Sequence, residues 1–68
     1  MKFQRGDLVE VMGTIGGQPW PHARGIVTGF YFGPTQDLIH VHVLEAETPV
    51  MLGPRLYSPG SLALVEAG

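Results

Sequence analysis

The sequence has no cysteine and little charge. The absence of cysteine excludes a disulfide framework, cysteine-ligated zinc and thiol chemistry, and it is typical of a reducing compartment. Only 15% of the 68 residues are charged, four basic and six acidic, which gives a formal net charge of −2. A chain with this net charge is not attracted to the phosphate backbone, and that attraction dominates non-specific nucleic-acid binding. Weak nucleic-acid binding is therefore kept only as a last alternative.

Long apolar runs are absent as well. No stretch reaches the roughly 18–20 apolar residues of a membrane span, and Lys2, Arg5 and Asp7 argue against an N-terminal secretory signal. We therefore expect a soluble, cytoplasmic protein that does not bind membranes. Apolar residues nonetheless make up 44% of the chain, which is too many for a disordered segment. A single folded domain over residues 1–68 is predicted.

Glycine and proline divide the chain into short segments. Ten glycines and six prolines punctuate runs of β-branched and aromatic residues, which is typical of an all-β protein. Residues 14–23 are predicted to form an irregular loop, because prolines flank Trp20. One turn of 3₁₀ helix is expected at residues 58–61. The predicted strands cover residues 8–12, 24–32, 38–44, 50–57 with a break at Gly53-Pro54, and 62–65.

The third predicted strand alternates cleanly between apolar and imidazole side chains. Because successive side chains point to opposite sides of a strand, His40 and His42 share one face. That spacing can hold zinc if a third ligand such as His22 or Asp37 lies near, or both imidazoles can simply face solvent. Without a second histidine or cysteine pair, we assign no metal. The opposite face is predicted to be core and consists of Ile39, Val41 and Val43.

Five short strands, a long first loop, a central hairpin and a one-turn connector resemble the SH3-like barrel. The resemblance covers nearly the whole chain and implies a small five-stranded antiparallel barrel with a one-turn 3₁₀ connector before the last strand. The alanine-leucine-tyrosine-aspartate-tyrosine signature of proline-binding SH3 domains is missing. Recognition of proline-rich peptides is therefore not implied.

Three segments also resemble the plasmid-encoded type II dihydrofolate reductases: Phe3 to Val9, Gly25 to Tyr31, and Leu56 to Tyr57. This resemblance implies a homotetramer whose central pore binds NADPH and dihydrofolate. The family's Val-Gln-Ile-Tyr pore motif is replaced here by residues 54–57, Pro-Arg-Leu-Tyr, so the pore glutamine is absent. Val11 stands where the family has its pore lysine. Because three segments match the family but the pore residues do not, a reductase of this kind is the alternative interpretation and not the first one.

The residues contain no recognisable catalytic or phosphate-binding motif. No serine, carboxylate or glycine arrangement has the required spacing, so we predict a non-enzymatic protein without a cofactor. A domain this small gains little from its own core, which favours an interaction module that self-associates or docks on another protein. Tryptophan, tyrosine and arginine dominate binding hot spots, although Trp20 could instead cap the barrel. The predicted binding residues are Trp20, His22, Tyr31, Arg55 and Tyr57.

Overall fold

The computed structural model describes residues 2–12, 14–15, 18–19, 23–46 and 52–68. The described residues are all-β, as predicted, and include no helix with the length and apolar character needed to cross a membrane. Their elements, in chain order, are β1 (Leu8–Val11), β2 (Thr14–Ile15), β3 (Gln18–Pro19), β4 (Ala23–Phe32), β5 (Asp37–Ala46), β6 (Gly53–Tyr57), the predicted 3₁₀ turn η2 (Pro59–Ser61) and β7 (Leu62–Glu66).

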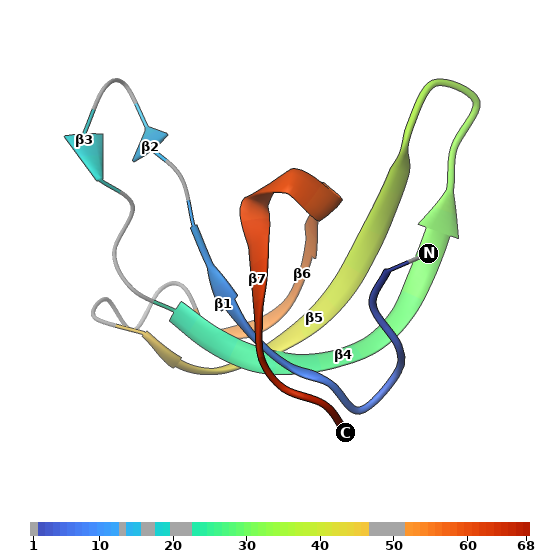
Figure 1. The fold of residues 1–68 in the computed structure, drawn as a ribbon. Coiled ribbons are helices and arrows are strands. Elements are labelled where there is room, and N and C mark those ends of the chain that lie inside the picture. Colours follow the sequence, from blue (N-terminus) through green and yellow to red (C-terminus); the bar gives the residue numbers. More distant parts are fainter. Residues whose placement is uncertain (1, 13, 16–17, 20–22, 47–51) are drawn as a thin grey trace.

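Five strands form one antiparallel sheet in the order β6-β5-β4-β1-β7, and β2 pairs with β3 in a separate hairpin (Figure 1). The two ten-residue strands β4 and β5 curve through the molecule and form its longest ladder. Within the described residues no ladder joins β6 to β7, so the sheet is open at both edges. The predicted five strands are therefore confirmed, and their arrangement is compatible with a small barrel-like fold.

Two local details differ from the sequence-based prediction. The segment predicted to be irregular contains the β2–β3 hairpin, in which Thr14 pairs with Pro19. Proline is tolerated there because each strand of an isolated pair has one unpaired edge. Gly53 and Pro54 begin β6, and residues 50–51 of the predicted strand lie outside the described residues. Gly53 has a φ of +100°, which glycine adopts without steric cost, and Pro54 lies on an edge strand where its missing N–H is tolerated.

The core lies on one face of the curved sheet. On β5, the three alternate residues predicted to be core are at most 2% exposed, so this prediction is confirmed. Phe30, Ala46 and Tyr57 pack against the buried cluster and extend it toward the sheet edges. The nine buried apolar residues are Phe3, Val9, Val11, Ala23, Val27, Ile39, Val41, Val43 and Leu62.

One buried carboxylate ties the two ends of the chain together. Asp7 accepts hydrogen bonds from the backbone N–H of Gly68 at 3.0 Å and from that of Gln4 at 2.9 Å. These bonds, the one from Gly68 first, lower the pKa of Asp7 below its usual value of 3.8, against the opposing effect of burial. The C-terminus consequently lies beside the segment that leads into β1 (Figure 1).

Candidate functional site

On the side of β4, β5 and β6 that faces away from the core, the part between Arg24 and the β4–β5 turn is here called the outer face. The pairing register defines it, because directly paired residues in an antiparallel sheet point to the same side. His42 pairs with Ile26 on β4 and with Pro54 on β6, and His40 pairs with Gly29 and with Leu56. The outer face consists of Ile26, Thr28, Gly29, Tyr31, Leu38, His40, His42, Leu44, Pro54 and Leu56.

The outer face so bounded carries no full charge, and it mixes apolar side chains with the polar ones of Thr28, Tyr31, His40 and His42. None of its ten residues is Asp, Glu, Lys or Arg. Three of its large side chains are at least half exposed: Tyr31 at 56%, Leu44 at 58% and Leu56 at 50%. Exposed apolar side chains are ordinary when scattered, but a contiguous group without charge is typical of a surface that binds another protein. The outer face is therefore the candidate interaction surface.

A β-bulge brings a hydroxyl group to the centre of the outer face. The β4–β5 register passes from Val27 opposite Val41 directly to Gly29 opposite His40, so Thr28 is the extra residue. The Thr28 hydroxyl lies 2.5 Å from Nδ1 of His40 and donates to the carbonyl oxygen of His40 at 3.2 Å. A side chain at Gly29 would meet nothing within 4 Å, so space beside His40 is open.

A charged row lies on the same side of the sheet and borders the outer face, because Arg24 alternates along β4 with the buried Ala23 and Gly25. Arg24 pairs in register with Glu10 on β1 and with Glu45 on β5. The Arg24 Nε lies 3.0 Å from Oε2 of Glu10, which makes an ion pair on the surface. Such a pair is screened by water and contributes little to folding. Its charges mark one limit of the apolar surface.

The structure divides the predicted binding residues between two sides of the sheet. Tyr31 lies on the outer face. Arg55 and Tyr57 pair with core residues of β5 and therefore lie on the core side of β6. The structure does not bring Tyr31 together with these two side chains. Trp20 and His22 fall outside the described residues.

Tyr57 and Arg55 form a second small feature at the sheet edge. The Tyr57 ring packs against the core, and its hydroxyl is buried without a hydrogen-bond partner among the described residues. Burial raises the pKa of Tyr57, while the positive charge of Arg55 opposes that shift. Arg55 is exposed on the same side of β6, and its positive charge could attract an anionic group to this edge.

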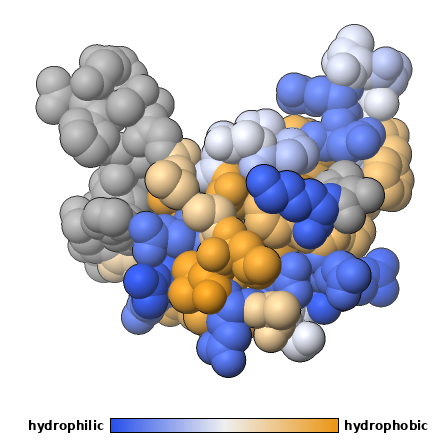
Figure 2. Space-filling model, in the orientation of Figure 1, coloured by the Kyte–Doolittle hydropathy of each residue, from blue (hydrophilic) through white to orange (hydrophobic). Residues whose placement is uncertain are grey.

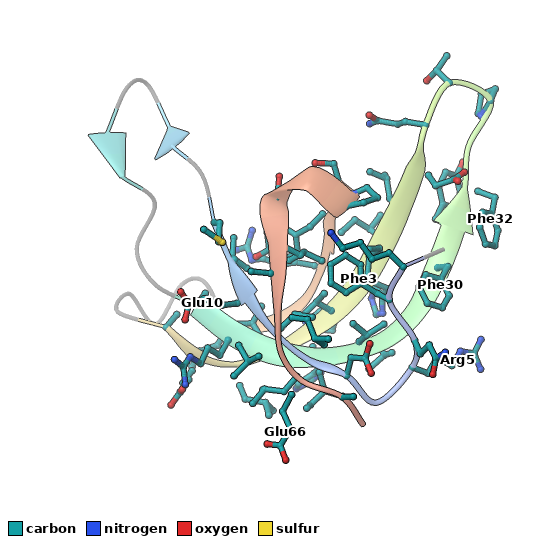
Figure 3. The ribbon with its side chains drawn as sticks, in the orientation of Figure 1. Phe3, Arg5, Glu10, Phe30, Phe32 and Glu66 are labelled. Atoms are coloured by element: carbon teal, nitrogen blue, oxygen red, sulfur yellow. The ribbon has the colours of Figure 1, made fainter. Side chains whose placement is uncertain are left out.

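A second apolar area lies over β7. Figure 2 shows an apolar patch on the front of the molecule, where β7 crosses it in Figure 1. Leu64 and Val65 of β7 are 52% and 43% exposed. At the far end of β4, Phe30 and Phe32 stack with ring centroids 6.3 Å apart (Figure 3). Both areas are smaller groups of apolar residues than the outer face.

Sequence reasoning chose Tyr31 as a binding residue and placed His40 and His42 on one strand face without assigning them a role, and it missed Thr28 and Leu56. An isolated glycine within a strand indicates a bulge, so Gly29 was a usable signal for Thr28. Leu56 had no such signal, because its place beside His40 depends on the register between β5 and β6. Register between strands that are distant in sequence does not follow from local pattern.

The described residues do not bring together three histidine, aspartate or glutamate side chains that could hold a metal ion within one chain. Comparison of the chain with protein-family models, with curated proteins and with solved structures finds no match in any of the three.

Proposed function

We propose that the protein is a small SH3-like module that self-assembles, with the outer face of one copy binding the outer face of a second. The observation that carries this proposal is the absence of charge from ten neighbouring residues, several of them large, apolar and half exposed. Interface cores are depleted in charged residues and enriched in aromatic ones. The order of the five strands supports the SH3-like part of the proposal.

The balance between buried and exposed apolar side chains also favours a second copy. Within the described residues nine apolar side chains form the core, and eight large hydrophobic ones are exposed. A standard interface buries roughly 800 Å² per partner, which is about a fifth of the 4447 Å² exposed by one chain. Because small domains gain little from their own cores, burying this area would add substantially to their stability.

Charge distinguishes a second copy from an unrelated partner. A two-fold interface places the same patch against itself, so a charged patch would repel its own copy. The outer face avoids this repulsion, because its only ionisable side chains are two histidines and a tyrosine. It also lacks the charges that would steer a partner of opposite sign. The face is therefore suited to its own copy.

The decisive experiment is the solution mass, measured by size-exclusion chromatography with light scattering over a dilution series. We expect the wild type to have a multiple of the 7.3 kDa chain mass. Leu56→Lys should shift the mass to that of a monomer, because it places a charge on both sides of the interface. Circular dichroism would show that the variant is folded.

Leu64→Lys is the matched control. Leu64 is 52% exposed, close to the 50% of Leu56, but it lies on β7 away from the outer face. This variant should keep the wild-type mass. A monomeric wild type at every concentration would refute self-assembly. If Leu64→Lys dissociates and Leu56→Lys does not, the interface lies at β7 and not on the outer face.

A second candidate function is that of a type II dihydrofolate reductase-like homotetramer. Arg55 supports it, because a guanidinium at the surface suits an anionic cofactor such as NADPH. Arg55 lies on the opposite side of β6 from the outer face, so self-assembly through that face would leave it exposed. Fluorescence titration with NADPH tests this function, and a flat titration of an oligomeric sample would exclude it.

A further inference from the structure

The outer face holds two histidines whose arrangement has a chemical consequence beyond apolar contact. His40 and His42 are two residues apart on β5, so their side chains share one side of the strand with Cα atoms roughly 7 Å apart. The residues paired with them in register are Ile26, Gly29, Pro54 and Leu56, none of which carries a charge. A cation would therefore meet no positive side chain at these positions.

The contacts of Thr28 select one tautomer of His40. The Thr28 hydroxyl has a single proton but lies near two groups, Nδ1 of His40 at 2.5 Å and the carbonyl oxygen of His40 at 3.2 Å. Both contacts are hydrogen bonds at once only if the hydroxyl donates to the carbonyl and accepts from Nδ1–H. The hydrogen-bond network thus assigns the proton to Nδ1 and leaves the lone pair on Nε2.

This arrangement matches what metal-binding histidines require. A histidine that ligates a metal usually donates its other ring N–H to a nearby oxygen, which fixes the orientation and tautomer of the ring. Thr28 supplies that oxygen for His40, and the bulge in β4 is what places it there. The open space at Gly29 leaves room beside the same ring.

We propose that His40 and His42 of two copies together bind one zinc ion in the self-assembled protein. Structural zinc sites use four ligands, usually arranged as a tetrahedron, and one chain offers two here. The described part of the chain supplies no third histidine, aspartate or glutamate near this pair. A two-fold axis through the outer face brings the same two histidines from the second copy, which completes four imidazole ligands. This inference rests on the self-assembly proposed above.

Zinc titration of the intact chain tests the site. Isothermal titration calorimetry should give one zinc ion for two chains, and light scattering should show a dimer that dissociates less on dilution in zinc chloride than in EDTA. His40→Ala and His42→Ala should each weaken zinc binding at least tenfold. His22→Ala is the control, because it removes the remaining histidine of the chain and should leave binding unchanged.

Thr28→Val separates orientation of His40 from simple chelation. Valine keeps the shape of threonine but cannot accept from Nδ1–H, so zinc affinity should fall about 10–100-fold while both ligands remain. Thr28→Ser retains the hydroxyl and should restore most of the affinity. Equal zinc affinity in wild type and Thr28→Val would overturn the role of Thr28. A wild-type isotherm like that of the double variant lacking both His40 and His42 would overturn the zinc site.

The mass measurements distinguish failure of the zinc site from failure of self-assembly. A dimer in EDTA that zinc does not strengthen refutes the zinc site and leaves self-assembly standing. A monomer in EDTA that becomes a dimer in zinc supports the shared zinc site and refutes self-assembly by apolar contact alone. A monomer in both solutions refutes both. Binding of one zinc ion per chain without dimerisation refutes the shared site.

Discussion

The two faces of β5 are built from the same ten residues and meet different surroundings. On the inner face, Ile39, Val41 and Val43 are almost completely buried, and the sheet curves around them. On the outer face, His40 and His42 alternate with those residues, and no other layer of the described chain covers them. Alternation with a period of two predicts equally well which side chains lie on each face. Whether a face is covered depends on the rest of the chain and on other molecules.

The inner face stabilises the fold, and the outer face is the proposed contact surface. The inner side chains of β5 are β-branched and almost fully buried, so truncating one of them leaves a cavity. The outer side chains of β5 are larger and more varied, and in a single chain they face water. Variants on the two faces should therefore change different measurements: unfolding free energy for the inner face, and mass for the outer face.

The largest expected effect comes from emptying the inner face. Ile39→Ala removes a fully buried side chain and should lower the free energy of unfolding by about 2–5 kcal/mol. His42→Ala, three residues away on the exposed side, should change it by only about 0.5 kcal/mol. Urea unfolding in EDTA, at a concentration low enough for the chain to be monomeric, checks both, because burial of His42 in an oligomer would add to the apparent stability. Equal losses would show that the outer face is as buried as the core.

Much of this comparison could be predicted from the sequence. The all-β class, the five strands, the 3₁₀ turn and the core face of β5 follow from turn residues and period-two alternation, both of which are local. The grouping of Leu56 with His40 could not be predicted, because it depends on strand pairing at a distance. Pairing also explains why Tyr31 and Tyr57, both singled out as binding residues, lie on different sides of the sheet.

A second pair of variants sharpens the comparison on the neighbouring strand. A Cβ at Gly25, which pairs with Val43 on the inner face, would collide with the His42 carbonyl oxygen and lie 2.8 Å from Cγ1 of Val41. Gly25→Ala should cost about 1–3 kcal/mol, as overpacking does. Gly29→Ala adds a methyl group in open space and should be neutral or stabilise by up to about 1 kcal/mol.

Thermal and urea unfolding of the two alanine variants measures this difference directly. Gly29 is a fair control because it lies on the same strand and its φ, like that of Gly25, is not positive. If both variants are destabilised by the same amount, the loss of glycine flexibility determines the cost. The face of the sheet on which the new methyl group lies then has no effect.

A third test concerns the one buried charge described above, that of Asp7. Its folded pKa is lowered by hydrogen bonds from Gly68 and Gln4, so its carboxylate stabilises the fold at pH values above about 3.8. That stabilisation is lost as the pH falls through the lowered folded pKa. Asp7→Asn should therefore be less stable than the wild type at pH 7 and should lose less stability on acidification.

Urea unfolding from pH 7 down to pH 3 follows this effect. Asp37→Asn is the matched control for the loss of one carboxylate, because Asp37 is exposed at the start of β5. Parallel acid profiles for wild type and Asp7→Asn would show that this carboxylate does not hold the chain ends together.

The smallest expected effect lies at the rim of the inner face, where Tyr57→Phe removes a hydroxyl that is buried without a partner in the described chain. Removing such a group should be neutral or raise the free energy of unfolding by up to about 1 kcal/mol. The reason is that the folded state no longer bears the free-energy cost of burying a hydroxyl without a hydrogen bond. Urea unfolding measures the stability, and light scattering measures the mass. Since Tyr57 lies on the core side of β6, the mass should not change. A loss of assembly in this variant would mean that the hydroxyl is satisfied by a second copy, which would place the contact surface at the core-side edge of β6 and not on the outer face.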